Sequence, residues 1–523
     1  MQNYKAILLL FIGLSIASCT DLELLPLDRA DPNAVLSSEE NYEAFLARIY
    51  SGLAVTGQQG PAGASDIQSL DEGFSQYLRP LWKLQELSTE SSVIAWGDAG
   101  LPELCFQTWT SDNQFVRAMY YRIFFQVSQA NEFLRETTEE KMAARGIREG
   151  FWPTVATYRA EVRFLRAFSY WHAIDMFGDV IFYTEESAVG GDNPPQQSRT
   201  EVFNFIVSEL AAIENELPEP GGNVYGRVDR AAVWMLQAKL FQNAEVYTGQ
   251  DRNSDAITAL EKIIGSNNYQ LEEEYAHLFG ADNHISRELI WTIPFDGLNT
   301  QTFGGLTYLT HAPVGGTMDP VAYGINGGWF GLRTTSGLVN MFDDPSGDTD
   351  ERAIFYTDGQ TLEINNISEF SQGYAVPKFT NITSTGEPGS DPRFADTDYP
   401  VFRLGDAYLM YAESVLRGGG GSREQALQYI NELRERAYDS DAGNITDGDL
   451  DLAFILDERS RELYWEGHRR TDLIRFDQFS ENGVWPWKGG VAEGQTTDSF
   501  RDLFPFPATE VLANPDLRQN AGY

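Results

Sequence analysis

The stretch Tyr399–Tyr438, YPVFRLGDAYLMYAESVLRGGGGSREQALQYINELRERAY, decides the fold. Apolar residues recur at steps of three and four between Leu404 and Val415, which places them on one face of a helix. The glycines at 418–421 end that helix, and Ser422 is a suitable N-cap for a second helix with similar spacing. The stretch therefore predicts a helix–turn–helix hairpin of tetratricopeptide size.

The same helical pattern recurs along the chain. It gives about four degenerate helix pairs, near residues 38–136, 152–217, 228–265 and 403–438. Irregular stretches rich in glycine, asparagine, aspartate and threonine lie near 55–110, 270–400 and 480–523. Because loops of this length inside a compact domain usually carry function, we predict a mainly α fold. It would consist of a tetratricopeptide-like scaffold and a large loop-rich ligand-binding half, within one domain over 38–523.

Residues 1–19, MQNYKAILLLFIGLSIASC, are typical of a bacterial lipoprotein signal. A single positive charge, Lys5, precedes an apolar run that is too short to span a bilayer and ends in small residues before Cys19. We predict a signal peptide over 1–18, acyl chains on Cys19 that anchor the chain to a membrane, and a tether over 19–37. An ordinary signal peptide with an accidental cysteine is the alternative.

The composition excludes several classes of function. The chain carries 77 acidic and 38 basic residues, a formal net charge of −39, which argues against binding to nucleic acid or to anionic lipid. The five histidines lack metal-ligand spacing, and no nucleophile elbow or phosphate loop is present, so we predict that the chain is not an enzyme. A surface glycosidase remains an alternative only because carboxylates are plentiful. The charged run at 458–475 is interpreted as a structural salt-bridge network, and Cys105 as a buried apolar residue.

Four long segments carry a resemblance to a known family. They are RAEVRFLRAFSYWHAIDMFGDV (159–180), YPVFRLGDAYLMYAESVLR (399–417), DERSRELYWEGHRRTDLIRF (457–476) and FPFPATEVLANPDLRQNAGY (504–523). They resemble signature segments of the SusD/RagB family, in the expected order. Shorter motifs such as LDEGFSQYLR (70–79), FGGLTYL (303–309) and WPWKGG (485–490) resemble its starch-binding members in particular.

This resemblance implies a non-catalytic lipoprotein on the outer-membrane surface. Such a protein binds oligosaccharides and delivers them to a SusC-like, TonB-dependent transporter. No cofactor is required for that role. The expected partners are a glucan oligosaccharide, the transporter and, through the lipid anchor alone, the membrane.

The resemblance also implies a set of ligand-binding residues. Sugars bind by packing their C–H faces on aromatic rings while polar side chains pair with their hydroxyls. By motif, the expected contacts are Trp96, Phe303, Asp71 and Arg79, with Asp98 as a further polar contact and Tyr308 as a possible extension of the platform. Tyr77 and Trp329 are further candidates for this extension, and for all three residues a role in the core is the better interpretation.

Because of three departures from the starch-binding pattern, the sequence does not decide which glucan is the ligand. Ile94 stands where those members have a second tryptophan, and Ala99 stands where they have an asparagine that binds sugar. Phe303 keeps the ring of a family tyrosine and loses its hydroxyl. A starch-type α-glucan is the first choice, and a different glucan, such as a β-1,3-linked one, is the alternative.

A calcium site is a further implication of the resemblance. Asp282, Asp396 and Asp398 are the candidate ligands, since Ca²⁺ requires several hard oxygen atoms. His284 stands where relatives have an acidic ligand.

Overall fold

The computed structural model describes residues 31–523 except 62, 69, 191 and 192. The predicted signal peptide, Cys19 and most of the predicted tether therefore lie outside the described residues. The end of that tether is already folded, because a short helix, α2 (Pro32–Val35), is followed by Leu36, which is buried against Tyr42 and Met142.

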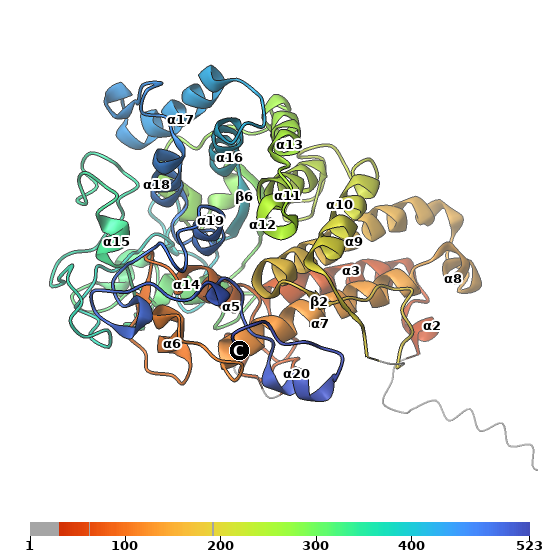
Figure 1. Ribbon diagram of the computed structural model, residues 1–523. Coiled ribbons are helices and arrows are strands. Elements are labelled where there is room, and N and C mark those ends of the chain that lie inside the picture. Colours follow the sequence, from red (N-terminus) through yellow and green to blue (C-terminus); the bar gives the residue numbers. More distant parts are fainter. Residues whose placement is uncertain (1–30, 62, 69, 191–192) are drawn as a thin grey trace, which may run out of the picture.

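The predicted helix pairs are present. They are α3 (Glu39–Ala54) with α7 (Gln114–Glu136), α9 (Trp152–Phe177) with α10 (Arg199–Ile213), α11 (Arg230–Gln242) with α13 (Asn253–Gly265), and α16 (Leu404–Leu416) with α17 (Arg423–Tyr438). Successive pairs also contact one another, through α7 and α9, α10 and α11, and α13 and α16. Figure 1 shows the resulting curved stack, and it confirms the prediction of a mainly helical, tetratricopeptide-like scaffold.

The hairpin of α16 and α17, on which the fold prediction rests, is present with the expected turn and cap. Ala407 and Ala412 are completely buried, so α16 lies close to its neighbours. Gly418 adopts a positive φ of 88° just after the helix, a conformation that glycine reaches without strain. Ser422 then caps α17 by accepting a hydrogen bond from the backbone N–H of Gln425.

The charged segment near the C-terminus is buried, as predicted. On α18 (Leu452–Leu463), Glu458 and Glu462 both pair with Arg352, and Glu462 also accepts a hydrogen bond of 2.6 Å from Arg403. The four side chains have at most 1% of their surface exposed. Because a buried charge is stable only when it is paired, this network joins the last helices to the loop-rich half.

The loop-rich half gathers beside the stack, around α14 and α15 in Figure 1. Its elements are short: α4 (Glu72–Ser75), α5 (Leu78–Glu86), β1 (Val93–Ile94), α6 (Leu101–Phe106), β4 (Leu289–Ile293), α14 (Gly305–His311), β5 (Leu332–Arg333), α15 (Ser336–Val339) and β6 (Tyr399–Arg403). The described chain also contains β2 (Val180–Ile181), β3 (Gln196–Gln197), α8 (Glu139–Ala144), α12 (Ala244–Thr248), α19 (Arg469–Arg475) and α20 (Ala508–Ala513). The strands pair antiparallel as β1–β5, β2–β3 and β4–β6.

The helix α5 was not expected, because 55–110 was interpreted as irregular. The apolar and polar residues of α5 do alternate with helical spacing, but the helix has only nine residues, too few for the pattern to stand out. Its polar residues, Lys83 and Glu86 included, are buried as well. Among the described residues, no helix is both long and apolar enough to cross a membrane.

Candidate functional site

A short antiparallel ladder brings together two tryptophans from distant parts of the chain. In the pairing of β1 with β5, Ile94 lies opposite Leu332. Trp96 and Trp329 flank this ladder, and the Trp96 indole Nε1 donates a hydrogen bond of 2.9 Å to the Trp329 carbonyl oxygen. The two half-buried rings lie 6.3 Å apart between centroids, at 42° to each other.

Gly331 allows the Trp96 ring to approach the backbone this closely. A Cβ atom on Gly331 would lie 2.6 Å from Cε2 of Trp96, well inside van der Waals contact. The Gly331 segment is itself fixed to the end of α14, because Trp329 N–H donates to the His311 carbonyl and Gly331 N–H to the Ala312 carbonyl. The position of the indole is therefore set by backbone contacts.

Phe303 is the third ring. Its centroid lies 6.3 Å from that of Trp329, and it is also half-buried. The turn that carries it is held by the motif at 70–79: Glu72 accepts hydrogen bonds from the Thr302 hydroxyl at 2.6 Å and from the Phe303 N–H at 3.2 Å. Trp96, Trp329 and Phe303 together form the aromatic arc.

Arg79 is buried and binds the backbone that carries Phe303. We expected it to contact the ligand, but only 6% of its surface is exposed. Its Nη1 donates a hydrogen bond of 2.8 Å to the Phe303 carbonyl oxygen, and its guanidinium carbon lies 4.5 Å from the centroid of Tyr308. Burial lowers the pKa of Arg79, and the nearby carboxylates Asp71 and Asp98 act against that decrease.

Tyr308 is not part of the platform. Its side chain is completely buried, edge-on to Trp96 at 6.1 Å, so the candidate ligand contact is corrected to a core residue. Tyr77 is likewise buried, as its core interpretation predicted. Tyr308 lies on α14 and Tyr77 is the N-cap residue of α5, and both side chains belong to the main hydrophobic core.

Exposed polar side chains surround the aromatic arc. Asp71 is exposed at the N-cap of α4, where it accepts a hydrogen bond of 3.1 Å from the Phe74 N–H. Asp98 is exposed in the loop after Trp96. Both lie within electrostatic reach of Arg79. Carboxylates in these positions are suited to accept hydrogen bonds from ligand hydroxyls.

Sequence reasoning missed two residues of this site and preferred another role for a third. Trp329 was a candidate extension of the platform for which a core role was preferred, and it is the middle ring of the aromatic arc. Arg393 is exposed, with its guanidinium carbon 4.9 Å from the Phe303 centroid. Phe330 is 52% exposed and has a φ of 54°, which is strained for an aromatic residue and is typical of functional positions. The unusual segment GGWFG at 327–331 could have signalled Trp329 and Phe330, whereas Arg393 lies outside it.

The candidate calcium ligands do not form a metal site. In the described part of the chain, no group of three or more acidic, histidine or cysteine side chains is arranged to hold a metal ion. Asp282 accepts hydrogen bonds from Ser384, Asp396 from Gly297 and Ser390, and Asp398 from Tyr225 and the Phe295 N–H. Each of these carboxylates therefore already accepts hydrogen bonds from protein donors.

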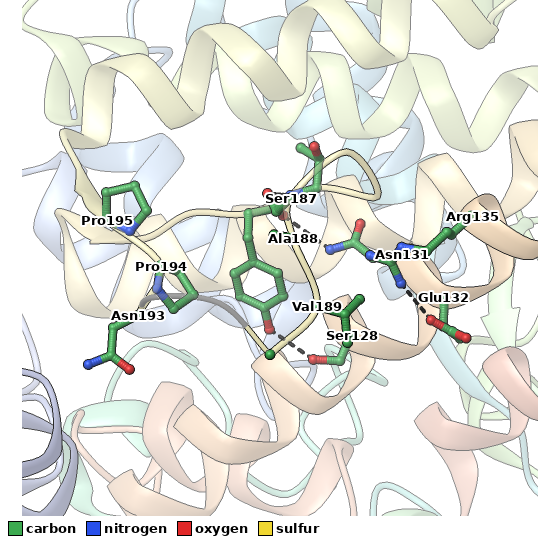
Figure 2. A pocket seen from close by; sticks show the side chains of 13 residues that line it. Ser128, Asn131, Glu132, Arg135, Ser187, Ala188, Val189, Asn193, Pro194 and Pro195 are labelled. Carbon is green, nitrogen blue, oxygen red and sulfur yellow. Dashed lines mark hydrogen bonds and ion pairs between the residues drawn. The ribbon is translucent and has the colours of Figure 1, made fainter. Parts of the chain in front are cut away.

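A separate pocket of about 640 Å³ lies between α7 and the connection from β2 to β3 (Figure 2). Its polar groups are already paired. Ser128 and Tyr183 share a hydrogen bond of 2.9 Å, Asn131 donates to the Tyr183 carbonyl, and Arg135 pairs with Glu132 at 2.5 Å. The pocket therefore offers fewer free partners to a ligand than the surroundings of the aromatic arc do.

The chemistry of the aromatic arc is that of an uncharged platform. His311 packs behind Trp329 at 5.0 Å, and burial lowers its pKa to about 4, so it is neutral at physiological pH. His172 and His468 are buried in the core, and burial lowers the pKa of each to about 3. Flat apolar rings with hydrogen-bonding groups at their edges match the two kinds of surface that a sugar presents.

Comparison with known proteins identifies the family of the chain. The SusD family model matches residues 329–523. The chain is 33% identical to the starch-binding protein SusD of Bacteroides thetaiotaomicron, covering 100% of this chain and 98% of that protein. It is 28% identical to the SusD-like protein P25 of Formosa agariphila over 70% of this chain and 73% of that protein.

Solved structures share the fold at low sequence identity. The surface glycan-binding protein A of B. thetaiotaomicron, solved in complex with laminarihexaose, has a TM-score of 0.69 and 20% identity, covering 92% of this chain and 99% of that one. A SusD superfamily protein of Bacteroides vulgatus has a TM-score of 0.70 and 19% identity, covering 93% and 99%. The full-length identity to SusD, more than these fold similarities, establishes that the chain belongs to the SusD family of non-catalytic, glycan-binding proteins.

Proposed function

We propose that the aromatic arc binds a starch-type α-glucan at the cell surface. The observation that carries this proposal is the arc itself: three half-buried rings in a row, each held by hydrogen bonds of its own segment. A preassembled aromatic platform needs little ordering when it binds a glucan chain. The similarity to starch-binding SusD over the full chain supports the same ligand class.

A β-1,3-glucan is the second candidate. Ile94 is buried in β1 with 1% of its surface exposed, so this position cannot present a ring to the ligand. The platform is therefore shorter than the starch-binding pattern requires. The similar fold solved with laminarihexaose keeps this alternative open.

Affinity electrophoresis tests the ligand class. The protein would be run in native gels containing amylopectin, pullulan or laminarin, with bovine serum albumin as the control for gel sieving. We expect retardation in amylopectin and pullulan. Retardation in laminarin alone would favour the second candidate, and no retardation in any gel would contradict glucan binding.

The proposal includes delivery of the glycan to a SusC-like, TonB-dependent transporter in the outer membrane. The lipid anchor at Cys19 would hold the protein beside that partner. In a cell that processes lipoproteins, Cys19→Ala is expected to move the protein from the membrane fraction to the soluble fraction. A variant that stays in the membrane fraction would contradict anchoring through Cys19.

A further inference from the structure

A second pocket lies close to the aromatic arc and has no role in it. It has a volume of about 390 Å³ and contains Tyr225, His284, Leu298 and the carboxylate of Asp396 in its lining. Tyr225 is 47% exposed and Leu298 62% exposed. Large apolar side chains are seldom left so exposed side by side unless they contact a partner or a ligand.

The Tyr225 ring is held rigidly in the wall of this pocket. Its hydroxyl donates a hydrogen bond of 2.5 Å to Oδ2 of Asp398, whose Oδ1 accepts one of 2.8 Å from the Phe295 N–H. His284, itself exposed, lies edge-on to the ring at 6.1 Å between centroids. A fixed aromatic face costs little conformational entropy when a ligand packs on it.

Polar groups complete the pocket. Asp396 and Asp296 contribute carboxylates, and His284 contributes ring nitrogens. An ionised carboxylate can accept further hydrogen bonds beyond those it receives from Gly297 and Ser390. An aromatic face beside carboxylate and imidazole groups can bind both the C–H face and the hydroxyls of a pyranose.

Two chain segments connect this pocket to the aromatic arc. Leu298 and Phe303 are five residues apart, so their Cα atoms lie within about 18 Å. Gly297 packs so closely on Phe394 that a Cβ atom would lie 2.6 Å from the Phe394 carbonyl oxygen. The Phe394 ring is in turn 5.6 Å from the Phe303 ring, between centroids.

From this arrangement we infer that the Tyr225 pocket is an outlying saccharide subsite, which binds a pyranose of the same glucan chain beyond the Phe303 end of the aromatic arc. The inference rests on the proposed function. It makes affinity depend on chain length: a short oligosaccharide occupies the aromatic arc alone, whereas a longer one also packs on Tyr225.

Calorimetric titration with maltotriose and maltoheptaose tests the inference. Tyr225→Ala is expected to weaken maltoheptaose binding roughly tenfold and to change maltotriose binding less than about twofold. Tyr225→Phe keeps the ring and loses only the hydrogen bond to Asp398, so it should bind both sugars as the wild type does. Leu512→Ala, which removes a side chain 86% exposed on α20, is the control for a surface truncation.

The outcomes separate the inference from the proposed function. Equal binding of maltoheptaose by wild type and Tyr225→Ala would overturn the inference. The exposed residues of the pocket would then be assigned to contact with a protein partner. Equal losses in Tyr225→Ala and Tyr225→Phe would also overturn it, because the effect would then come from the lost hydrogen bond. If the wild type binds neither sugar, the proposed function fails and the inference fails with it.

Discussion

The Trp96 indole donates its hydrogen bond to the backbone carbonyl of Trp329, a residue 233 positions later in the chain. This contact fixes the edge of one ring against the segment that carries the next. Both rings remain half-buried, so each keeps part of its surface available. The two tryptophans therefore form one rigid surface before any ligand arrives, and a ligand gains affinity when its binding site needs no reordering.

Gly331→Ala should weaken glucan binding with little loss of stability. The added methyl group would lie 2.6 Å from the Trp96 ring and would displace the indole from Trp329. We expect the dissociation constant, measured by calorimetry, to rise about tenfold or more. The matched control is Gly97→Ala, next to Trp96, where an added Cβ atom meets no neighbour within 4 Å. Equal affinities of the two variants would show that the position of the indole is unimportant.

Arg393→Ala and Arg79→Met should differ in their effects. Arg393 is exposed beside Phe303, so its loss is expected to raise the dissociation constant several-fold and leave the thermal midpoint unchanged. Arg79 is buried and donates to the Phe303 carbonyl, so its replacement should also lower the free energy of unfolding by about 1–3 kcal/mol. Differential scanning fluorimetry combined with calorimetry separates the two. A fall in thermal midpoint for Arg393→Ala would contradict the exposed position of Arg393 beside Phe303.

Lys83→Met should stabilise the protein near neutral pH. Within the described chain, the Lys83 Nζ has no hydrogen-bond partner, and it lies 4.1 Å from the Phe115 ring centroid. Burial lowers the pKa of Lys83 well below 10.5, with Arg79 adding to the decrease. Replacing a buried unpaired charge by an apolar side chain is expected to raise the free energy of unfolding by roughly 1–4 kcal/mol.

The gain in stability from Lys83→Met should decrease as pH increases. A lysine whose pKa is lowered on folding destabilises the folded state. This penalty is complete below the folded pKa and disappears as pH rises from the folded pKa to 10.5. Urea unfolding of both proteins at several pH values should show the advantage of Lys83→Met shrinking as pH increases. An advantage that grows with pH would contradict the buried, unpaired ammonium.

Glu462→Gln should strongly destabilise the protein. Burial alone would raise the pKa of Glu462, but Arg436, Arg403 and Arg352 overcome it, so the pKa is lowered. Removing one member of a buried network leaves charges unpaired, and the expected loss is about 3–5 kcal/mol. Because a lowered carboxyl pKa stabilises the folded state fully above the ordinary value of 4.5 and progressively less as pH falls towards the lowered pKa, the difference from wild type should narrow below pH 4.5. A constant difference across that range would contradict the assignment.

The scaffold could be predicted because its helices are amphipathic or capped by recognisable residues. α16 and α17 follow from their spacing, the glycines between them and Ser422. By contrast, α5 is amphipathic over only nine residues, which is too short a pattern to indicate a helix, and both of its faces are buried. The resemblance identified Trp96 and Phe303 as site residues. It could not show that Arg79 lies beneath them, because burial depends on packing between segments more than 200 residues apart.

Trp329 shows the same limit for a residue that was preferred as a core residue but belongs to the aromatic arc. A tryptophan in a glycine-rich segment is compatible with either a core or a platform position. Only the pairing of β1 with β5 brings it beside Trp96. The calcium prediction meets a related limit, because Asp282, Asp396 and Asp398 each accept hydrogen bonds from a different set of backbone and hydroxyl donors.

Calorimetric titration of maltoheptaose into wild type and Trp96→Ala tests the central claim most directly. The claim is that the aromatic arc, and Trp96 within it, forms the glucan platform. The account predicts saturable binding by the wild type and at least a tenfold weaker association for the variant, with the thermal midpoint of the two proteins nearly equal because Trp96 is only half-buried. Undiminished binding by a folded Trp96→Ala variant would contradict it.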